Sequence, residues 1–154
     1  MQKESLLKKL LFISSFLLTV WGVVGIIYTS LNLNYSSNTE LYGQFYQIVI
    51  FTLEVFAMLI AFLFIKFKKD YVGVISLVFS LLMALIALVE VFIFAVLIYG
   101  AIKGTSLNGV GWFDWAELII SFVLCLFYFI IFIMLYKYLH DIEKDKKENS
   151  GRKV

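Results

Sequence analysis

The sequence predicts an all-α integral membrane protein, folded as an antiparallel bundle of four transmembrane helices with both termini in the cytoplasm. Of its 154 residues, 62% are hydrophobic and 16% are charged, whereas about 25% of a typical soluble domain is charged. The hydrophobic residues form four long stretches, and nearly all basic residues lie on one side of them. With a single cysteine as well, this composition excludes a soluble globular domain, a disordered chain and a disulfide-stabilised secreted domain.

The four stretches run from about 10 to 28, 45 to 65, 71 to 102 and 115 to 136. A helix needs about 20 residues to cross a hydrocarbon core of about 30 Å, because each residue rises about 1.5 Å. The stretches must be helical, since no water satisfies backbone polar groups inside the core. The third stretch would measure about 48 Å as a helix, so we expect it to tilt or to project beyond the membrane.

The basic residues predict the orientation. Lysine and arginine occupy 13 positions, and Lys103 is the one that falls on the side opposite the chain ends. Because cytoplasmic loops are enriched in these residues, both termini are expected in the cytoplasm and the protein in the plasma membrane. Residues 1–139 are expected to form a single membrane domain. Residues 140–154 are expected to form a charged tail that extends the last helix by a turn or two.

Small and polar residues recur on one face of each span, at the spacing that places them along a helix–helix contact. Apolar surface alone gives helices in lipid little preference for one another, so these faces are expected to point inward. The residues are Ser15, Thr19, Gly22 and Gly25; Gln47, Glu54, Ala57 and Ala61; Gly73, Ser76, Ser80, Met83, Ala87 and Glu90; and Glu117, Ser121, Cys125 and Tyr128.

Three glutamates on these faces are the candidate ion- or partner-binding residues. Glu54 lies roughly 13 Å inside the second span, Glu90 lies in the outer half of the third, and Glu117 lies in the first turn of the fourth. A carboxyl group in hydrocarbon must be paired, hydrated or protonated. No span contains a basic residue, so Glu54 and Glu90 are expected to be at least partly protonated.

Two interpretations of the glutamates remain open. In one, they bind a proton or a cation, or compensate a cationic group on a ligand or partner helix. In the other, they are structural and bond across the bundle to hydroxyl groups. The hydroxyl groups considered are those of Thr19, Ser76, Ser80 and Ser121.

Aromatic residues are expected mainly at the membrane interfaces. Those predicted for the outer interface are Tyr28, Tyr42, Phe45, Tyr46, Trp112, Phe113 and Trp115. Trp21 lies near the middle of the first span instead, where we expect packing beside Gly25, with stacking on a ligand as the alternative. Asn34 begins a glycosylation sequon on the outer side, which is a weak signal.

No motif for catalysis stands out. His140 and Cys125 lie far apart along the expected fourth helix, and there is neither a nucleophile with a nearby base nor a glycine-rich phosphate loop. The basic tail is too mixed in charge for nucleic acid. The sequence therefore predicts a protein that is not an enzyme, with no catalytic residue, cofactor, metal or nucleic-acid partner.

Short loops, continuous helices and unpaired carboxyls favour a non-enzymatic protein that acts through helix contacts with another membrane protein or peptide. It would be an accessory or regulatory subunit, or an immunity-type protein. The alternative is a proton- or cation-coupled small transporter or oligomeric channel that uses Glu54 and Glu90. A homo-oligomer is compatible with both.

Overall fold

The computed structural model describes residues 2–33, 38–67, 70–104 and 111–151, with side chains described at all of these except 38–42, 70 and 145–151. The described residues form four helices: α1 (Gln2–Leu31), α2 (Asn38–Lys66), α3 (Asp70–Ile102) and α4 (Trp112–Gly151). Each is long and apolar enough to cross a membrane. The prediction of an all-helical fold with four helices able to span a membrane is therefore confirmed for the described residues. The sequon at Asn34 lies outside the described residues.

The helices extend beyond the apolar stretches. The first begins at Gln2 and the last continues to Gly151, further than the turn or two that we expected. The added turns are rich in lysine and glutamate, which are good helix formers, and the chain contains no proline to stop a helix. In α1, the Lys8 ammonium also pairs with the Glu4 carboxylate one turn earlier, at 2.5 Å.

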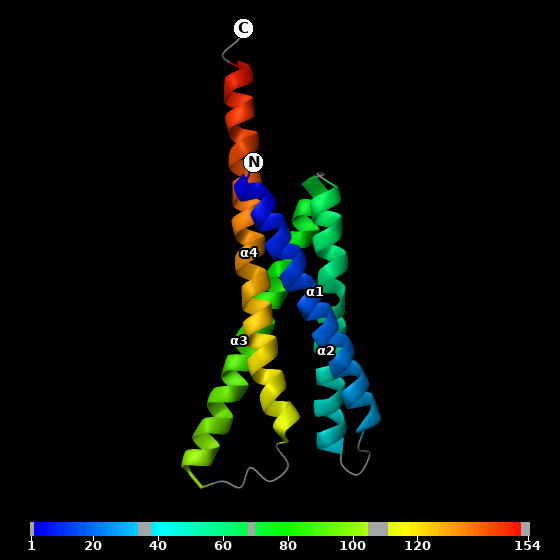
Figure 1. Ribbon diagram of the computed structural model, residues 1–154. Coiled ribbons are helices and arrows are strands. Elements are labelled where there is room, and N and C mark those ends of the chain that lie inside the picture. Colours follow the sequence, from blue (N-terminus) through cyan, green and yellow to red (C-terminus); the bar gives the residue numbers. More distant parts are fainter. Residues whose placement is uncertain (1, 34–37, 68–69, 105–110, 152–154) are drawn as a thin grey trace.

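Successive helices run in opposite directions along the molecule (Figure 1). We call the end that holds Gln2 and Gly151 the terminal end, and the end where α1 leads to α2 and α3 leads to α4 the loop end. Packing is most extensive between α1 and α2, followed by α3 with α4 and α1 with α4, and it is much less extensive between α2 and α3. Toward the loop end, α3 diverges from α2 (Figure 1).

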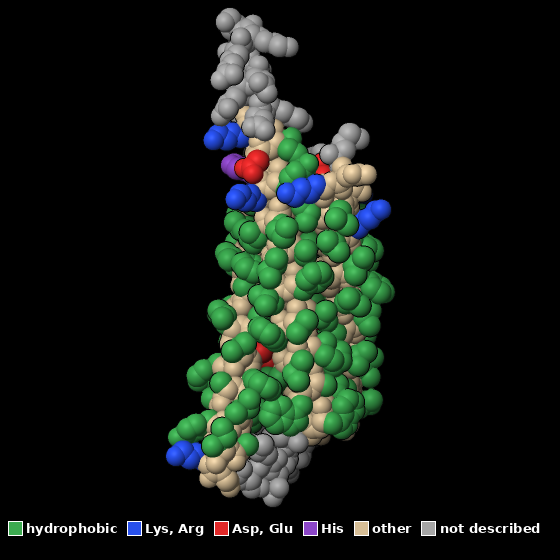
Figure 2. All heavy atoms as spheres, turned by 60° about the vertical axis from the view of Figure 1, so that its left-hand side comes forward, with side chains coloured by type: hydrophobic (Ala, Val, Ile, Leu, Met, Phe, Trp, Pro, Cys, Tyr) green, Lys and Arg blue, Asp and Glu red, His purple; other side chains and the backbone are tan. Residues whose placement is uncertain are grey.

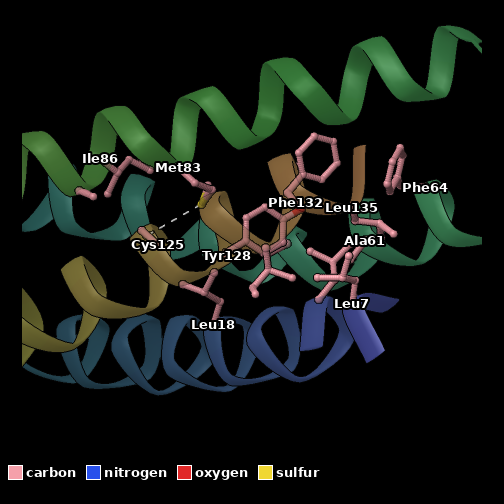
Figure 3. Close-up of a cluster of buried hydrophobic side chains, with 14 of the residues drawn as sticks. Leu7, Leu18, Ala61, Phe64, Met83, Ile86, Cys125, Tyr128, Phe132 and Leu135 are labelled. Carbon is pink, nitrogen blue, oxygen red and sulfur yellow. Dashed lines mark hydrogen bonds between the residues drawn. The ribbon is translucent and has the colours of Figure 1, made fainter. Parts of the chain in front are cut away.

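The predicted inward faces are the buried ones. Gly22 and Gly25 of α1 are buried against α2, where a Cβ atom on Gly22 would lie 2.6 Å from the backbone oxygen of Phe51. Near the middle of the molecule, Met83 of α3 meets Cys125 and Tyr128 of α4, all fully buried (Figure 3). Small residues thus allow the helix backbones to approach, as expected for helices in lipid.

The outer faces of the helices are apolar. Hydrophobic side chains cover the flank of the molecule, whereas basic side chains gather mainly at the terminal end (Figure 2). Exposed examples include Val78 (62%), Leu88 (66%) and Phe92 (70%) of α3. Such a surface is unsuited to water and suited to lipid chains or to an apolar partner.

Candidate functional site

The three glutamates come from three different helices and all face the interior. Glu54 of α2 is 0% exposed, Glu90 of α3 is 2% exposed and Glu117 of α4 is 5% exposed. Each carboxyl group is close enough to the other two for their charges to interact. The helices therefore bring together residues that are as many as 63 positions apart in the sequence.

Glu117 is held by a residue of the facing helix. The Gln47 side-chain amide of α2 donates a hydrogen bond of 2.6 Å to Oε2 of Glu117. The sequence predicted an inward position for both residues. It did not predict their pairing, which depends on the rotation of α2 relative to α4.

Glu54 lies deeper, beside a chain of polar groups from α1 and α4. The Trp21 indole N–H donates to the Ser121 hydroxyl at 3.0 Å, and Ser121 in turn interacts with the Glu54 carboxyl. The Cys125 thiol points at Oε1 of Glu54 across 3.7 Å. Trp21 also stacks on Phe113, with 5.8 Å between ring centroids, so its role is packing combined with a hydrogen bond.

Several buried acceptors in this region have no hydrogen-bond partner within the described part of the chain. They include Oε2 of Glu54, Oε2 of Glu90 and the hydroxyl of Thr29. The Thr29 residue as a whole is 3% exposed. Buried polar atoms are normally satisfied, so each such atom calls for an explanation. A ligand, a partner group or water bound between the helices would satisfy these atoms.

A cavity of about 690 Å³ opens among the four helices at the loop end. Glu90, Glu117 and Asp114 line it, together with the unsatisfied Thr29 hydroxyl, and none of the described lining residues is basic. Aromatic side chains complete the wall: Tyr28, Tyr46 and Phe113. This loop-end cavity exists because α3 diverges from α2, and its wall is both acidic and aromatic.

Glu90 also lies next to a second, smaller pocket, on the flank of the molecule. It lines this pocket of about 140 Å³ between α3 and α4, whose other walls are apolar and include Val91, Phe94 and Phe122. Acidic atoms are visible within the apolar flank in Figure 2, in the half nearer the loop end. Glu90 thus contributes to the walls of both the loop-end cavity and a pocket between α3 and α4.

Two of the four hydroxyl groups considered as partners for the glutamates bond elsewhere. Ser80 donates to the carbonyl of Leu77 in its own helix at 2.8 Å, a common alternative for serine within a helix. Thr19 donates to the carbonyl of Val55 at 3.2 Å. The hydroxyl of Ser76 has no partner among the residues described. Of the four hydroxyl groups considered, only that of Ser121 interacts with a glutamate.

The aromatic residues include one clear correction. Phe113, which the sequence assigned to the interfacial belt, is 4% exposed and lies between Trp21 and Tyr28. It is the second residue of α4, and α1 covers it at that point. Thr29 was missed altogether, since a threonine at the end of a span gives no signal until the cavity beside it is known.

The arrangement is suited to holding a positively charged group or a proton. Among the residues with described positions, no three His, Cys, Asp or Glu side chains are grouped closely enough to hold a metal ion. Comparisons of the chain with protein-family models, with curated proteins and with solved structures give no match. The chemistry of the site therefore rests on the residues of this chain alone.

Proposed function

We propose that this protein is a non-enzymatic membrane protein that binds a transmembrane helix of another membrane protein, or a membrane peptide, beside the loop-end half of α3. It would act as an accessory or regulatory subunit, or as an immunity-type protein that binds and blocks a membrane-active peptide. The bundle is antiparallel in this proposal and lies in the plasma membrane with both termini cytoplasmic. The absence of lysine and arginine, other than Lys103, from the opposite side supports that orientation.

The observation that carries the proposal is the state of α3 between Val91 and Ile102. No side chain in this range is buried. The preceding part of the helix contributes six buried residues to the interior: Ser76, Ser80, Met83, Ile86, Ala87 and Glu90. A helix that diverges from its neighbours loses packing, which is the main attraction between helices in lipid. A further helix seated beside α3 would restore that packing.

Charge complementarity specifies the occupant. Glu90 and Glu117 lie beside this segment of α3 in the wall of the loop-end cavity, and no described lining residue is basic. An apolar helix with a basic residue in its outer half would match both the apolar flank and the carboxyls. A second copy of this chain fits less well, because its spans contain no basic residue.

The test is affinity purification of the tagged full chain from its native membranes in mild detergent, with mass spectrometry of the proteins that remain bound. Leu97→Trp enlarges a side chain that lines the loop-end cavity and is expected to displace the partner. Val78→Trp places the same indole side chain on an exposed face of α3 and serves as the matched control.

A stoichiometric partner that is lost with Leu97→Trp and kept with Val78→Trp would support the proposal, provided that its membrane segment carries a lysine or arginine in the outer half. Recovery of the chain alone, or of proteins that both variants retain equally, would overturn it.

A second candidate is a proton- or cation-coupled small transporter or oligomeric channel. The observation in its favour is that the interacting carboxyls extend from Glu117 and Glu90 at the loop-end cavity to the fully buried Glu54. Flux into liposomes that contain the purified protein separates the two functions. Glu54→Gln and Glu90→Gln should abolish flux in a transporter, whereas in an accessory protein they should mainly weaken partner binding.

A further inference from the structure

We infer that the loop-end cavity is a binding site for a guanidinium or ammonium group. This inference rests on the proposed function and deepens it, since it names the group that the partner presents and the residues that receive it. The same chemistry could come from a free small cation, and the experiment below separates the two sources.

The charge of the cavity is the first argument. Three carboxyl groups line it, those of Glu90, Asp114 and Glu117, without a basic residue among the described lining residues. Gln47 donates to Glu117 and the backbone N–H of Gly111 donates to Asp114 at 2.6 Å, but neither donor carries a full positive charge. A bound cation would supply the missing charge, whereas an anion would be repelled.

Unsatisfied acceptors are the second argument. Glu90 and Thr29 both line the cavity, and the Oε2 atom of Glu90 and the hydroxyl of Thr29 have no hydrogen-bond partner among the described residues. They belong to side chains that are 2% and 3% exposed, so bulk solvent does not satisfy them. Guanidinium has five N–H donors when attached to a side chain, and ammonium has three. Either group can bond to more than one acceptor at once.

The aromatic wall is the third argument. Tyr28 and Tyr46 line the cavity and are 37% and 44% exposed. Tyr28 is held in place by stacking on the buried Phe113, with 3.8 Å between ring centroids. Cations are attracted to the faces of aromatic rings, and the flat guanidinium group can also stack on them. An acidic site with aromatic walls therefore selects a cation with a delocalised or alkyl-substituted charge over a compact hydrated ion.

The volume of the cavity favours a basic side chain of a partner over a free small cation as the bound group. A volume of about 690 Å³ falls within the range of pockets that hold a drug-sized ligand, and a small free cation would fill only part of it. A lysine or arginine side chain, together with part of the helix that carries it, fits this volume better. The expected occupant is therefore a basic side chain of the partner helix.

The first arm of the experiment titrates methylguanidinium into the purified full chain in lipid nanodiscs and follows binding by calorimetry. Methylurea, a neutral analogue of similar shape, is the control ligand. Saturable binding of methylguanidinium without binding of methylurea is expected. Equal binding of both compounds, or no saturable binding of either, would overturn the inference.

Variants assign the binding to the cavity. Glu90→Gln should weaken methylguanidinium binding at least about tenfold, because a hydrogen bond to a charged group is lost. Thr29→Val, which keeps the side-chain shape, should weaken it by a smaller factor and provides the test if Glu90→Gln does not fold. Glu143→Gln removes a carboxylate from an exposed position on the far part of α4 and should leave the affinity unchanged. Unchanged affinity in both cavity variants would contradict the site.

The second arm compares two transmembrane peptides of leucine and alanine that differ at one outer position, arginine in one and glutamine in the other. Preferential binding of the arginine peptide, lost with Glu90→Gln, identifies a partner side chain as the source. If methylguanidinium binds and neither peptide does, the cation site is supported and a free small cation is identified as the source. A third outcome is that Leu97→Trp displaces a partner but the protein binds neither methylguanidinium nor the arginine peptide. That outcome would overturn this inference alone, and the proposed function would still stand.

Discussion

At the scale of single residues, the interior near Glu54 is held by a small number of polar contacts between helices. Ser121 is central, because it accepts the Trp21 N–H at 3.0 Å and interacts with Glu54. It therefore connects α1 and α4 to the buried carboxyl on α2. In an apolar interior, the loss of one such group leaves its partner unsatisfied, and that penalty exceeds the value of an average hydrogen bond.

Ser121→Ala should lower the free energy of unfolding by about 1–3 kcal/mol, since the Trp21 N–H loses its acceptor. Ser80→Ala is the matched control, because the Ser80 hydroxyl bonds only to the backbone of its own helix and its loss should cost less. Unfolding in mixed detergent micelles, followed by tryptophan fluorescence, measures both changes. Equal losses in the two variants would contradict the role assigned to Ser121.

At the scale of elements, α1 and α2 form the most closely packed pair. The approach of their backbones depends on Gly22 and Gly25, both buried against Phe51. A Cβ atom at Gly22 would meet the Phe51 backbone oxygen at 2.6 Å and Cβ of Glu54 at 3.1 Å. Backbone cannot move aside as a flexible side chain can. The two helices would therefore have to separate next to the candidate site.

Gly22→Ala should lower the free energy of unfolding by about 1–3 kcal/mol, the usual cost of overpacking. Gly73→Ala in α3 is the control, because its Cβ atom would lie 3.7 Å from the nearest atom, a ring carbon of Tyr136. That variant should be neutral or up to about 1 kcal/mol more stable, since alanine favours a helix over glycine. The same unfolding assay applies, and a loss at Gly73 as large as that at Gly22 would argue against backbone approach as the cause.

At the scale of the whole molecule, the two ends differ in charge and in packing. The terminal end bears most of the basic residues (Figure 2), whereas α3 diverges from α2 at the loop end (Figure 1). In the proposed orientation, the terminal end lies in the cytoplasm and the acidic cavity opens toward the outside. A partner helix would then meet the carboxyls in the outer half of the membrane.

Cysteine labelling tests that orientation. The one cysteine, Cys125, is fully buried, and Cys125→Ala provides a background without thiols. Single cysteines at the exposed positions Ser5 and Lys103 are then treated with a membrane-impermeant maleimide. The cysteine at 103 should react in intact cells, and the cysteine at 5 only after the cells are opened. The reverse pattern would place the termini outside.

The sequence by itself determined the four spans and their inward faces. Long apolar stretches leave the backbone no alternative to a helix in lipid, and the 3.6-residue period assigns small and polar residues to one side. The burial of Gly22, Glu54, Ser80 and Cys125 follows from these two rules.

Only the tertiary structure decided which inward residues meet and where a cavity remains. The period of a helix identifies a face, but not its depth or rotation relative to a neighbour. The pairing of Gln47 with Glu117 and the position of Phe113 beneath α1 were therefore not predictable. The loop-end cavity depends on the angle at which α3 leaves α2, and that angle follows from the packing of side chains on all four helices together.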